Sequence, residues 1–386
     1  NEQKYDKLLK GLEISEILLK SFLKENLDFR LDSEYFLKEN LKKIKTLESI
    51  GFSKVGDFAF VTDGIHTSID YCENSTVYLF SATTPKENFF DLSRNVFISE
   101  KAHSDNPRTA LKLNDIIIST VGTIGNCAVV SDSVLPANSD RHVGIIRLSS
   151  EKFKPRFIST FLLSKYGRFQ TWRESTGNVQ LNLFLYRIRT LKVPNLSIAF
   201  QERIEDMVLN SDNNRSLSKQ KYQEAEALLL ETLKISDFEP SDKAVNVKSF
   251  KESFVLTGRL DAEYYQPKYE NYLNLIISRK HSFIKNEYNQ IKDVVDRNLE
   301  EYNYIEIGDV NVSDGMSVPH RVLLEELPAN GKIRAKKGDL LISKVRPYRG
   351  AVSIVNEDYQ NLVVSGAFTV LRSNPNSKFN NEVLKD

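Results

Sequence analysis

Apolar residues near the start of the chain recur every three or four positions, which is the spacing of one helical face. Leu8, Leu12 and Leu19 follow this spacing, so a helix is predicted over residues 5–24. A second, shorter helix is predicted over residues 33–47. The chain therefore opens with helices rather than strands.

The pattern then changes, and residues 50–150 hold short apolar runs rich in Val, Ile, Phe and Thr, broken by Gly, Asn, Asp and Pro. Such runs are typical of a compact mixed sheet. The clearest strands are predicted at residues 115–120 and 128–131. The glycine-containing segment 121–126 between them predicts a loop, since glycine adopts positive φ at little cost. Helical spacing returns over residues 156–173.

A polar turn at residues 176–180 interrupts the helical pattern, which resumes as a long segment over about 198–235. Ser197 is a plausible N-cap for that segment. The run Asp212-Asn213-Asn214 weakens its middle, so one helix or two are compatible with the pattern. Residues 236–255 predict a polar linker that contains a proline.

The chain also repeats itself at a long interval. The run FRLDSEYF at residues 29–36 returns as GRLDAEYY at 258–265, and LNDIIIS at 113–119 returns as KGDLLIS at 337–343. The first pair is offset by 229 positions and the second by 224. Two matches in the same order and at nearly the same offset indicate a duplicated domain, because this period is far too long for a solenoid.

The predicted fold class is α+β, with two similar domains of small mixed sheets and helices, joined by long spacer helices that can form an antiparallel coiled coil. We expect an N-terminal helix at 1–28, a first domain at 29–197, a helical spacer and linker at 198–254, and a second domain at 255–386. The strand-like tail of the second copy, residues 367–371, is followed by far fewer residues than its counterpart. We therefore expect the second domain to be truncated at its C-terminus.

Composition narrows the functional classes. With 53 Lys and Arg against 52 Asp and Glu, the net charge is +1, so any nucleic-acid contact depends on local charge or on partner subunits. Cys72 and Cys127 are too few for a disulfide framework or a four-cysteine zinc site. The sequence has neither an apolar run that suits a membrane helix nor a secretory signal over residues 1–10, so a cytoplasmic protein without membrane partners is expected.

Catalytic signatures are missing from the sequence. It has no phosphate-binding G-x-x-x-x-G-K-[ST] loop, no Asn/Asp-Pro-Pro-Tyr run, no H-E-x-x-H and no G-x-S-x-G. The carboxylate pairs Asp32/Glu34 and Asp261/Glu263 recur in both copies and are read as capping and salt-bridging groups at a helix start. We expect no catalysis and no metal in this chain, although a nuclease or methyltransferase without these signatures is a third alternative.

The segment 331–350 is the most basic part of the chain, with seven basic residues against Asp339. Arginine reads guanine through two hydrogen bonds, and lysine holds phosphate, so this segment is a candidate DNA contact. The alternative is a charged strand edge that prevents aggregation. The candidate DNA contacts are Lys332, Lys336, Lys344, Arg346, Tyr348 and Arg349. The other two basic residues of the segment are Arg334 and Lys337.

In the first copy, the matching place is occupied by the polar run 120–126, so the two copies share strands and differ at this loop. Loop tips that vary on a common scaffold are typical of binding sites, although plain packing roles are the alternative. The candidates are Thr120, Thr123, Asn126, Arg141, His142, Asn178 and Gln180. On the spacer, a stripe suited to partner subunits holds Tyr222, Ala225, Leu228, Leu229 and Leu233.

Five segments together resemble the specificity subunits of type I restriction-modification systems. They are residues 29–35, 176–180, 193–197, 201–204 and 338–346. The resemblance implies two recognition domains that each read half of a split double-stranded DNA target, with spacer helices that fix their separation. It also implies methyltransferase (M) and restriction (R) subunits as partners, to which S-adenosylmethionine, ATP and Mg would belong. The run Pro194-Asn195-Leu196-Ser197 departs from the usual Pro-Leu-Pro turn. A two-domain protein–protein adaptor without DNA binding is the alternative.

Overall fold

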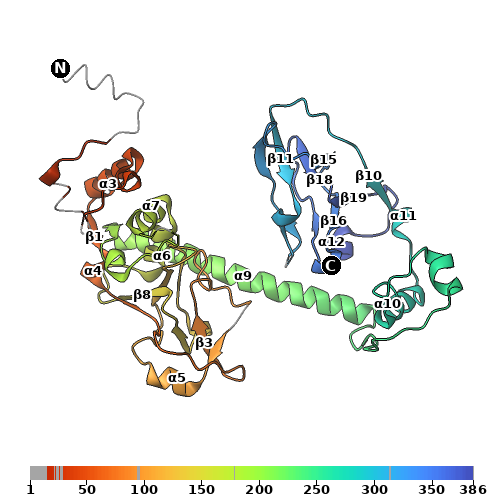
Figure 1. Ribbon diagram of the computed structural model, residues 1–386, viewed down its shortest axis with the longest axis horizontal. Coiled ribbons are helices and arrows are strands. Elements are labelled where there is room, and N and C mark those ends of the chain that lie inside the picture. Colours follow the sequence, from red (N-terminus) through yellow and green to blue (C-terminus); the bar gives the residue numbers. More distant parts are fainter. Residues whose placement is uncertain are drawn as a thin grey trace. The chain divides into compact units, whose positions relative to one another are not determined.

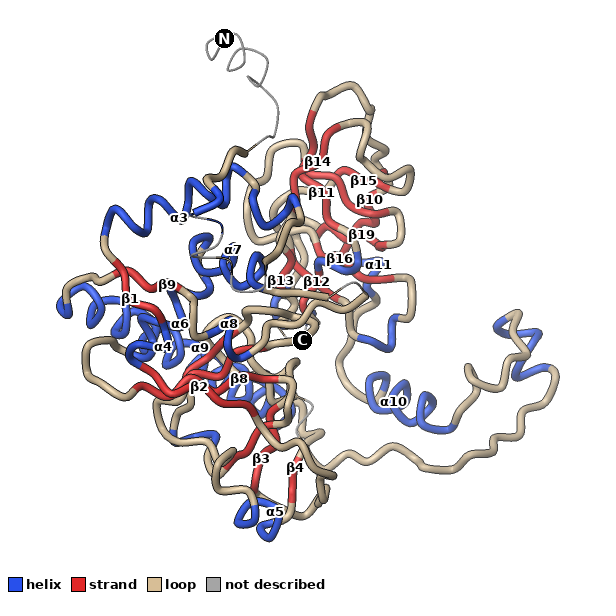
Figure 2. The backbone as a smooth tube through the Cα atoms, turned by 60° about the vertical axis from the view of Figure 1, so that its left-hand side comes forward, coloured by secondary structure: helices blue, strands red, loops and turns tan. Residues whose placement is uncertain are grey.

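The computed structural model describes residues 15–20, 22, 26, 29–93, 96–177, 179–312 and 314–385. The helix predicted over residues 5–24 lies largely outside them. Contacts divide the chain into unit 1, Asn1–Lys221, and unit 2, Tyr222–Asp386 (Figure 1). Strands and helices occur in both units (Figure 2), so the predicted α+β class is confirmed.

Unit 1 carries its strands in small sheets. The described strands are β1 (Phe52–Lys54), β2 (Ala59–Asp63), β3 (Val77–Phe80), β4 (Phe97–Ile98), β5 (Ile116–Ser119), β6 (Cys127–Val129), β7 (Ala137–Ser139), β8 (Val143–Leu148) and β9 (Lys192–Pro194). An antiparallel sheet has the order β2-β8-β5-β6, a mixed sheet has the order β4-β3-β7, and β1 pairs with β9. The strands predicted at residues 115–120 and 128–131 are thus confirmed as β5 and β6.

The helices of unit 1 surround these sheets. They are the 3-10 turns η1 (Ser33–Phe36) and η2 (Asp132–Val134), and the helices α3 (Lys38–Ile50), α4 (Val55–Phe58), α5 (Glu100–Asp105), α6 (Pro155–Leu163), α7 (Lys165–Glu174), α8 (Leu185–Ile188) and α9 (Ile198–Thr232). The helical pattern predicted over residues 156–173 is confirmed, and it forms two helices, α6 and α7. Ser164 separates them, and its Oγ accepts hydrogen bonds from the backbone N–H groups of Tyr166 and Gly167 at 3.2 and 3.4 Å. The local cap replaces helical hydrogen bonds at this point.

The long helix α9 is continuous over 35 residues and passes through the boundary between the units. Its first turn is capped by Ser197, whose Oγ accepts from the backbone N–H of Phe200 at 3.4 Å, as predicted. The polar run 212–214 does not break it, since Asn and Asp cost only a few tenths of a kcal/mol each within a helix. At 1.5 Å per residue the helix is about 50 Å long.

Unit 2 is built in the same way. Its described strands are β10 (Tyr288–Ile291), β11 (Glu301–Ile305), β12 (Val310–Asn311), β13 (Met316–Ser317), β14 (His320–Leu323), β15 (Gly331–Arg334), β16 (Leu340–Ser343), β17 (Val352–Ile354), β18 (Leu362–Ser365) and β19 (Phe368–Ser373). Its helical elements are the π turn η3 (Lys251–Val255), the 3-10 turns η4 (Ile307–Asp309) and η5 (Pro347–Arg349), and the helices α10 (Pro267–Ile277), α11 (Ile284–Glu287) and α12 (Asn381–Lys385). The main sheets have the orders β10-β19-β16-β17 and β14-β11-β18-β15.

The duplication predicted from the sequence is confirmed by the strand pairing. The order β2-β8-β5-β6 in unit 1 matches β10-β19-β16-β17 in unit 2, and the pairs are antiparallel in both. Even the register agrees: Ile116 lies opposite Ile146 in unit 1, and their counterparts Leu340 and Leu371 lie opposite each other in unit 2. The two units are therefore copies of one fold.

The second sheet repeats as well. In unit 1, β3 runs parallel to β7, with Tyr78 opposite Ala137. In unit 2, β11 runs parallel to β18, with Asn303 opposite Leu362. Parallel neighbours require a crossover connection, so the shared arrangement reflects shared topology and not only similar hairpins.

A buried ion pair occupies the same place in each copy. Asp115, just before β5, accepts hydrogen bonds from Arg147 at 2.8 and 2.5 Å, and Asp339 accepts two from Arg372 at 2.7 Å each. The exposed fractions of the two aspartate side chains are 1% and 0%. Hydrogen bonding to these carboxylates raises the pKa of both arginines. The pairs tie the first strand of each hairpin to β8 or β19.

Apolar side chains cover both faces of the main sheet in unit 1. Ile116 and Ile118 point to one face, where they pack with Ile158 of α6 and Ile188 of α8. Ile117 points to the other face and packs with residues of β3 and β7. This alternation explains why β5 reads as a continuous apolar run.

We expect Asp115→Asn to destabilise unit 1 by about 2–4 kcal/mol, because it leaves the guanidinium of Arg147 without its buried counter-charge. Trp172 is the single tryptophan of the chain, so its fluorescence reports urea unfolding of unit 1. Asp339→Asn is expected to leave this transition unchanged while it shifts the circular dichroism transition of unit 2. The exposed Asp132→Asn is the control. Equal midpoints for Asp115→Asn and Asp132→Asn would show that the buried pair does not stabilise the fold.

Candidate nucleic-acid interface

The turn between β16 and β17, residues 344–350, is fully exposed and is called the β16–β17 tip. Its backbone is fixed by local hydrogen bonds from Arg349 N to Arg346 O and from Gly350 N to Pro347 O, each 3.0 Å long. Arg346 takes the left-handed conformation with φ of +49°, which turns the chain sharply. Tyr348 stands out with 80% of its surface exposed. The tip therefore presents its side chains to solvent on a defined turn.

The cations of this tip have no acidic partners within the described residues. No ion pair joins Lys344, Arg346 or Arg349 to a carboxylate there. Many other arginines of the chain are engaged in ion pairs, such as Arg372 with Asp339. Unpaired exposed cations on a fixed turn are suited to an anionic partner such as a phosphate chain.

The predicted basic segment is divided by the fold. Lys332 lies on β15 next to Gly331, and Gly331 is paired with Ser365 of β18. Just after Ser365, the carbonyl of Ala367 accepts a hydrogen bond from the backbone N–H of Lys344 at 2.9 Å. Lys332 and the β16–β17 tip thus lie toward the same end of the unit. Lys336 lies at the opposite end of β16, where its backbone N–H donates to Asp339 at 2.9 Å. The sequence treated these lysines as one patch, and the structure separates Lys336 from it.

The matching turn of unit 1, residues 120–126, is called the β5–β6 tip, and it is packed down. Ile124 is buried in the core and Thr120 is only 7% exposed. The carbonyl of Thr120 accepts from Leu183 N at 2.9 Å, and Thr123 Oγ1 donates to Ala82 O at 3.0 Å. The side chain of Thr120, a predicted DNA contact, is thus buried in this structure. Thr123 remains exposed and Asn126 is half-buried.

The other candidates of unit 1 gather around the β5–β6 tip. The turn with Arg141 and His142 adjoins it through the hydrogen bond from Thr120 N to His142 O at 3.1 Å. Val121 forms a β-bridge with Asn182, which places the segment of Gln180 alongside. Arg141 and Gln180 are exposed, and His142 Nδ1 lies 3.1 Å from Asp140 Oδ2. Asn178 lies outside the described residues.

The two tips differ in exposure because different segments surround them. In unit 1, Asn182, Leu183 and α7 contact the β5–β6 tip, and a Cβ added at Gly125 would lie 2.6 Å from Thr171 Oγ1. No equivalent segment covers the β16–β17 tip within the described residues of unit 2. Sequence comparison of the two loops had no signal for this difference, since the covering residues lie about 50 positions away.

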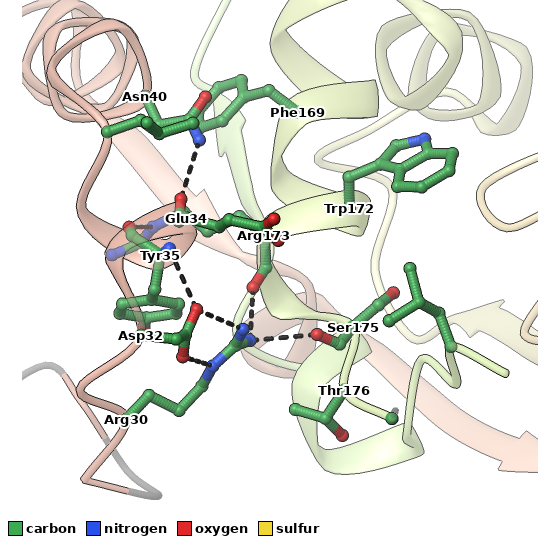
Figure 3. Close-up of a pocket in the computed structure, with 13 residues that line it drawn as sticks. Arg30, Asp32, Glu34, Tyr35, Asn40, Phe169, Trp172, Arg173, Ser175 and Thr176 are labelled. Carbon is green, nitrogen blue, oxygen red and sulfur yellow. Dashed lines mark hydrogen bonds and ion pairs between the residues drawn. The ribbon is translucent and has the colours of Figure 1, made fainter. Parts of the chain in front are cut away.

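A pocket of about 620 Å³ lies between the 30–40 segment and α7 (Figure 3). Arg30 donates to both carboxylate oxygens of Asp32 at 2.7 and 2.9 Å, and to the carbonyls of Arg173 and Ser175. The hydrogen bond from Arg30 lowers the pKa of Asp32, which also accepts from Tyr35 N at 3.1 Å. The interpretation as a capping and salt-bridging group is confirmed for Asp32.

Tyr35 is held between two guanidinium groups in this region. Arg173 lies 3.6 Å from the centre of its ring and Arg30 lies 4.8 Å from it. Sequence reasoning missed Arg173, because it lies 138 positions from Tyr35 and has no local motif. This packing ties the start of unit 1 to α7.

The predicted spacer residues lie along the second half of α9 and just after it. Leu228 and Leu233 are 64% and 40% exposed, and Ala225 is exposed. The Nζ of Lys385 lies 5.7 Å from the ring centre of Tyr222. In the part of the chain that is described, no group of three or more His, Cys, Asp or Glu side chains is arranged to hold a metal ion. The described helices include none with the length and apolarity needed to traverse a bilayer.

We expect Gly125→Ala to destabilise unit 1 more than Gly122→Ala. Both glycines have positive φ, +82° and +71°, so each substitution is expected to cost about 1 kcal/mol or more. Only at Gly125 does the new methyl group also meet Thr171, whereas nothing lies within 4 Å at Gly122. Urea unfolding followed by Trp172 fluorescence measures both. Equal losses would show that the β5–β6 tip is not packed against α7.

No family model matches the chain, and no curated protein matches it. It is similar to the crystal structure of the type I restriction-modification system S subunit from M. genitalium, at 12% identity, 84% of this chain, 73% of that chain and a TM-score of 0.38. The HsdS subunit from Thermoanaerobacter tengcongensis is similar at 13% identity, 87% of this chain, 78% of that chain and a TM-score of 0.30. The type IIG restriction endonuclease BpuSI is similar over 46% of this chain and 28% of that chain, at 8% identity and a TM-score of 0.36.

Proposed function

We propose that this chain is a DNA-recognition subunit that reads a bipartite target and performs no chemistry itself. One observation carries the proposal: the two units share strand order, register and a buried ion pair, yet differ at the matching β5–β6 and β16–β17 tips. A common scaffold with different tips is what two readers of different base sequences require.

In unit 2, the β16–β17 tip supplies both kinds of contact that DNA recognition needs. The forked guanidinium groups of Arg346 and Arg349 suit guanine O6 and N7 in the major groove, and each such contact discriminates by about 1–3 kcal/mol. Lys344 and Lys332 suit phosphates, which position the protein without reading sequence. Tyr348 adds an exposed ring between the arginines.

In unit 1, the exposed groups around the β5–β6 tip are mostly neutral. Thr123, Asn126, His142 and Gln180 offer hydrogen-bond donors and acceptors to base edges, and Arg141 offers the one charge of this set. This set is less basic than that of unit 2. Unit 1 would therefore contribute more to specificity than to salt-dependent affinity.

The helix α9 would act as the spacer. A continuous helix of about 50 Å is stiff enough to hold two readers at a defined separation. Two exposed leucines, Leu228 in its second half and Leu233 just after it, would contact methyltransferase subunits, and a restriction subunit would join that complex. S-adenosylmethionine, ATP and Mg would be bound by those subunits, and the complex would work in the cytoplasm.

We expect the double variant Arg346→Ala/Arg349→Ala to weaken binding to duplex DNA and to reduce its salt dependence. If both groups neutralise phosphates, the slope of log affinity against log salt falls by about 2. If one reads a base, affinity for the preferred sequence falls by about tenfold to a hundredfold more than for other sequences. Fluorescence anisotropy across a salt series, with duplexes selected from a random pool, measures both effects.

The matched control is Lys337→Ala, an exposed cation at the opposite end of β16. It is expected to leave the slope and the selected sequence unchanged. An equal effect of Lys337→Ala would mean that charge acts diffusely and that the tip is not the reader. Duplex binding without salt dependence, or no binding by the chain and its complexes, would favour the protein–protein adaptor instead.

A further inference from the structure

Arg108 lies in the turn after α5 of unit 1 and is not among the contacts predicted from the sequence. Its guanidinium is held against the end of β2. Nη1 donates to Thr62 Oγ1 and to Asp63 Oδ1, the latter at 3.1 Å, and Nη2 donates to the carbonyl of Gly64 at 3.2 Å. The exposed fraction of the arginine side chain is nevertheless 53%. The guanidinium is therefore fixed in orientation and still accessible to a ligand.

The main chain of this turn is fixed as well. Thr109 is 2% exposed, and its Oγ1 accepts from Nδ2 of the fully buried Asn138 at 2.8 Å. The same nitrogen of Asn138 donates to the carbonyl of Asn106 at 3.2 Å. Because Asn138 belongs to β7, the turn is anchored to a sheet on both sides of Arg108. The side chain thus starts from a defined position.

The Nε–Nη2 edge of the Arg108 guanidinium remains open. Its Nε donates to no group among the described residues, because the hydrogen bonds to β2 leave from Nη1 and Nη2. In Arg30, Arg147 and Arg372, by contrast, Nε and Nη2 donate to the two oxygens of one carboxylate. This edge carries two parallel N–H groups, which match a carboxylate or the O6 and N7 atoms of guanine.

Contacts connect this arginine to the β5–β6 tip. The backbone of Gly64, which binds Arg108, packs on that of Asp140, since a Cβ added at Gly64 would lie 2.2 Å from the carbonyl oxygen of Asp140. The side chain of Asp140 accepts from the backbone N–H of His142 at 2.8 Å. The carbonyl of His142 accepts from Thr120 N at 3.1 Å. Arg108 therefore lies beside the predicted DNA contacts of unit 1.

The charge of Arg108 is balanced by Asp63, whose Oδ2 lies 2.5 Å from His66 Nε2. Burial raises the pKa of Asp63, but hydrogen bonds from His66 and Arg108 outweigh this effect and leave the pKa below its usual value. Asp63 is therefore ionised at neutral pH, and the Arg108–Asp63 pair has no net charge. Attraction to phosphates depends on uncompensated cations. The open edge is consequently better suited to a base than to the DNA backbone.

We propose that Arg108 reads a guanine in the half of the target that unit 1 contacts, with Nε and Nη2 donating to O6 and N7. This assignment rests on the proposed DNA recognition and specifies one base of the target. Asp63 is the positioning residue, because it holds the guanidinium in the orientation that leaves this edge open. Since the side chain is already ordered, little conformational entropy is lost on binding.

The test compares Arg108→Lys with the unmodified chain on duplexes selected from a random pool. Each guanine is replaced in turn by 7-deazaguanine, which has C–H in place of the N7 acceptor. The unmodified chain is expected to lose about tenfold in affinity at a guanine to which Arg108→Lys is insensitive, because an ammonium group cannot form the two parallel bonds. Fluorescence anisotropy measures the affinities, and urea unfolding followed by Trp172 fluorescence establishes that the variant is folded.

The matched control is Arg259→Lys in unit 2. The Arg259 side chain is 52% exposed, but its Nε and Nη2 already donate to Asp261 at 2.7 and 2.5 Å. This substitution is expected to leave the set of sensitive guanines unchanged. Asp63→Ala is expected to remove the sensitivity at the guanine that Arg108 reads. It is also expected to steepen the salt slope by about 1, because the released guanidinium becomes an unpaired cation.

The outcomes distinguish this inference from the proposed function. If the same guanines are sensitive in Arg108→Lys and in the unmodified chain, or if Arg259→Lys changes the set, the assignment is overturned. A loss in Arg108→Lys that is equal for all duplexes would identify a phosphate contact and would also overturn it. In each case duplex binding persists, so the proposed DNA recognition stands. Absence of salt-dependent duplex binding by the chain and its complexes would refute the DNA recognition itself, and this inference with it.

Discussion

A buried aspartate held by an arginine fixes the strand that leads to each tip. Asp115 and Asp339 sit just before β5 and β16, and each is bonded twice by the arginine of the neighbouring strand. Removing the arginine would leave a buried carboxylate without its counter-charge, at a cost of several kcal/mol. A slip of one residue would also reverse every side chain of β5. The position of each tip therefore follows from this one interaction.

With the base of each hairpin fixed, the tips are free to diverge. The β5–β6 tip carries no charged residue, and it packs against Asn182, Leu183 and Thr171. The β16–β17 tip is basic and stands in solvent, with Tyr348 80% exposed. The turn can therefore differ between the copies without disturbing the fold, because changes at the turn leave the buried pair and the strand register intact.

The duplication could be predicted from the sequence because the repeated runs contain residues that form contacts with near neighbours in the chain. Arg30 and Asp32 form a pair within one turn, as do Arg259 and Asp261, so the pattern is visible without tertiary information. Strands β5 and β6 were predicted for the same reason, since the apolar run and the glycine loop are local signals.

Other features depend on contacts between distant residues and had no local signal. Thr120 is buried because residue 183 returns to it, and Arg173 is placed by Tyr35, which lies 138 positions earlier. The break at Ser164 is local, because its own side chain accepts hydrogen bonds from the first turn of α7. Lys336 was grouped with the tip by sequence proximity, although a strand places the two at opposite ends. Such cases are those in which tertiary packing overrides a local pattern.

The exposed Arg259–Tyr264 surface of unit 2 and the covered Arg30–Tyr35 surface of unit 1 derive from the same duplicated domain. A copied domain inherits both halves of every internal contact, so its local geometry is shaped for the segments that covered the original. Where such a segment is not present in the described residues, as α7 is not in unit 2, the inherited half remains in shape and exposes Tyr264 and Ile276. Duplication thus explains why both copies share the Arg–Asp–Tyr arrangement, although only that of unit 1 is buried.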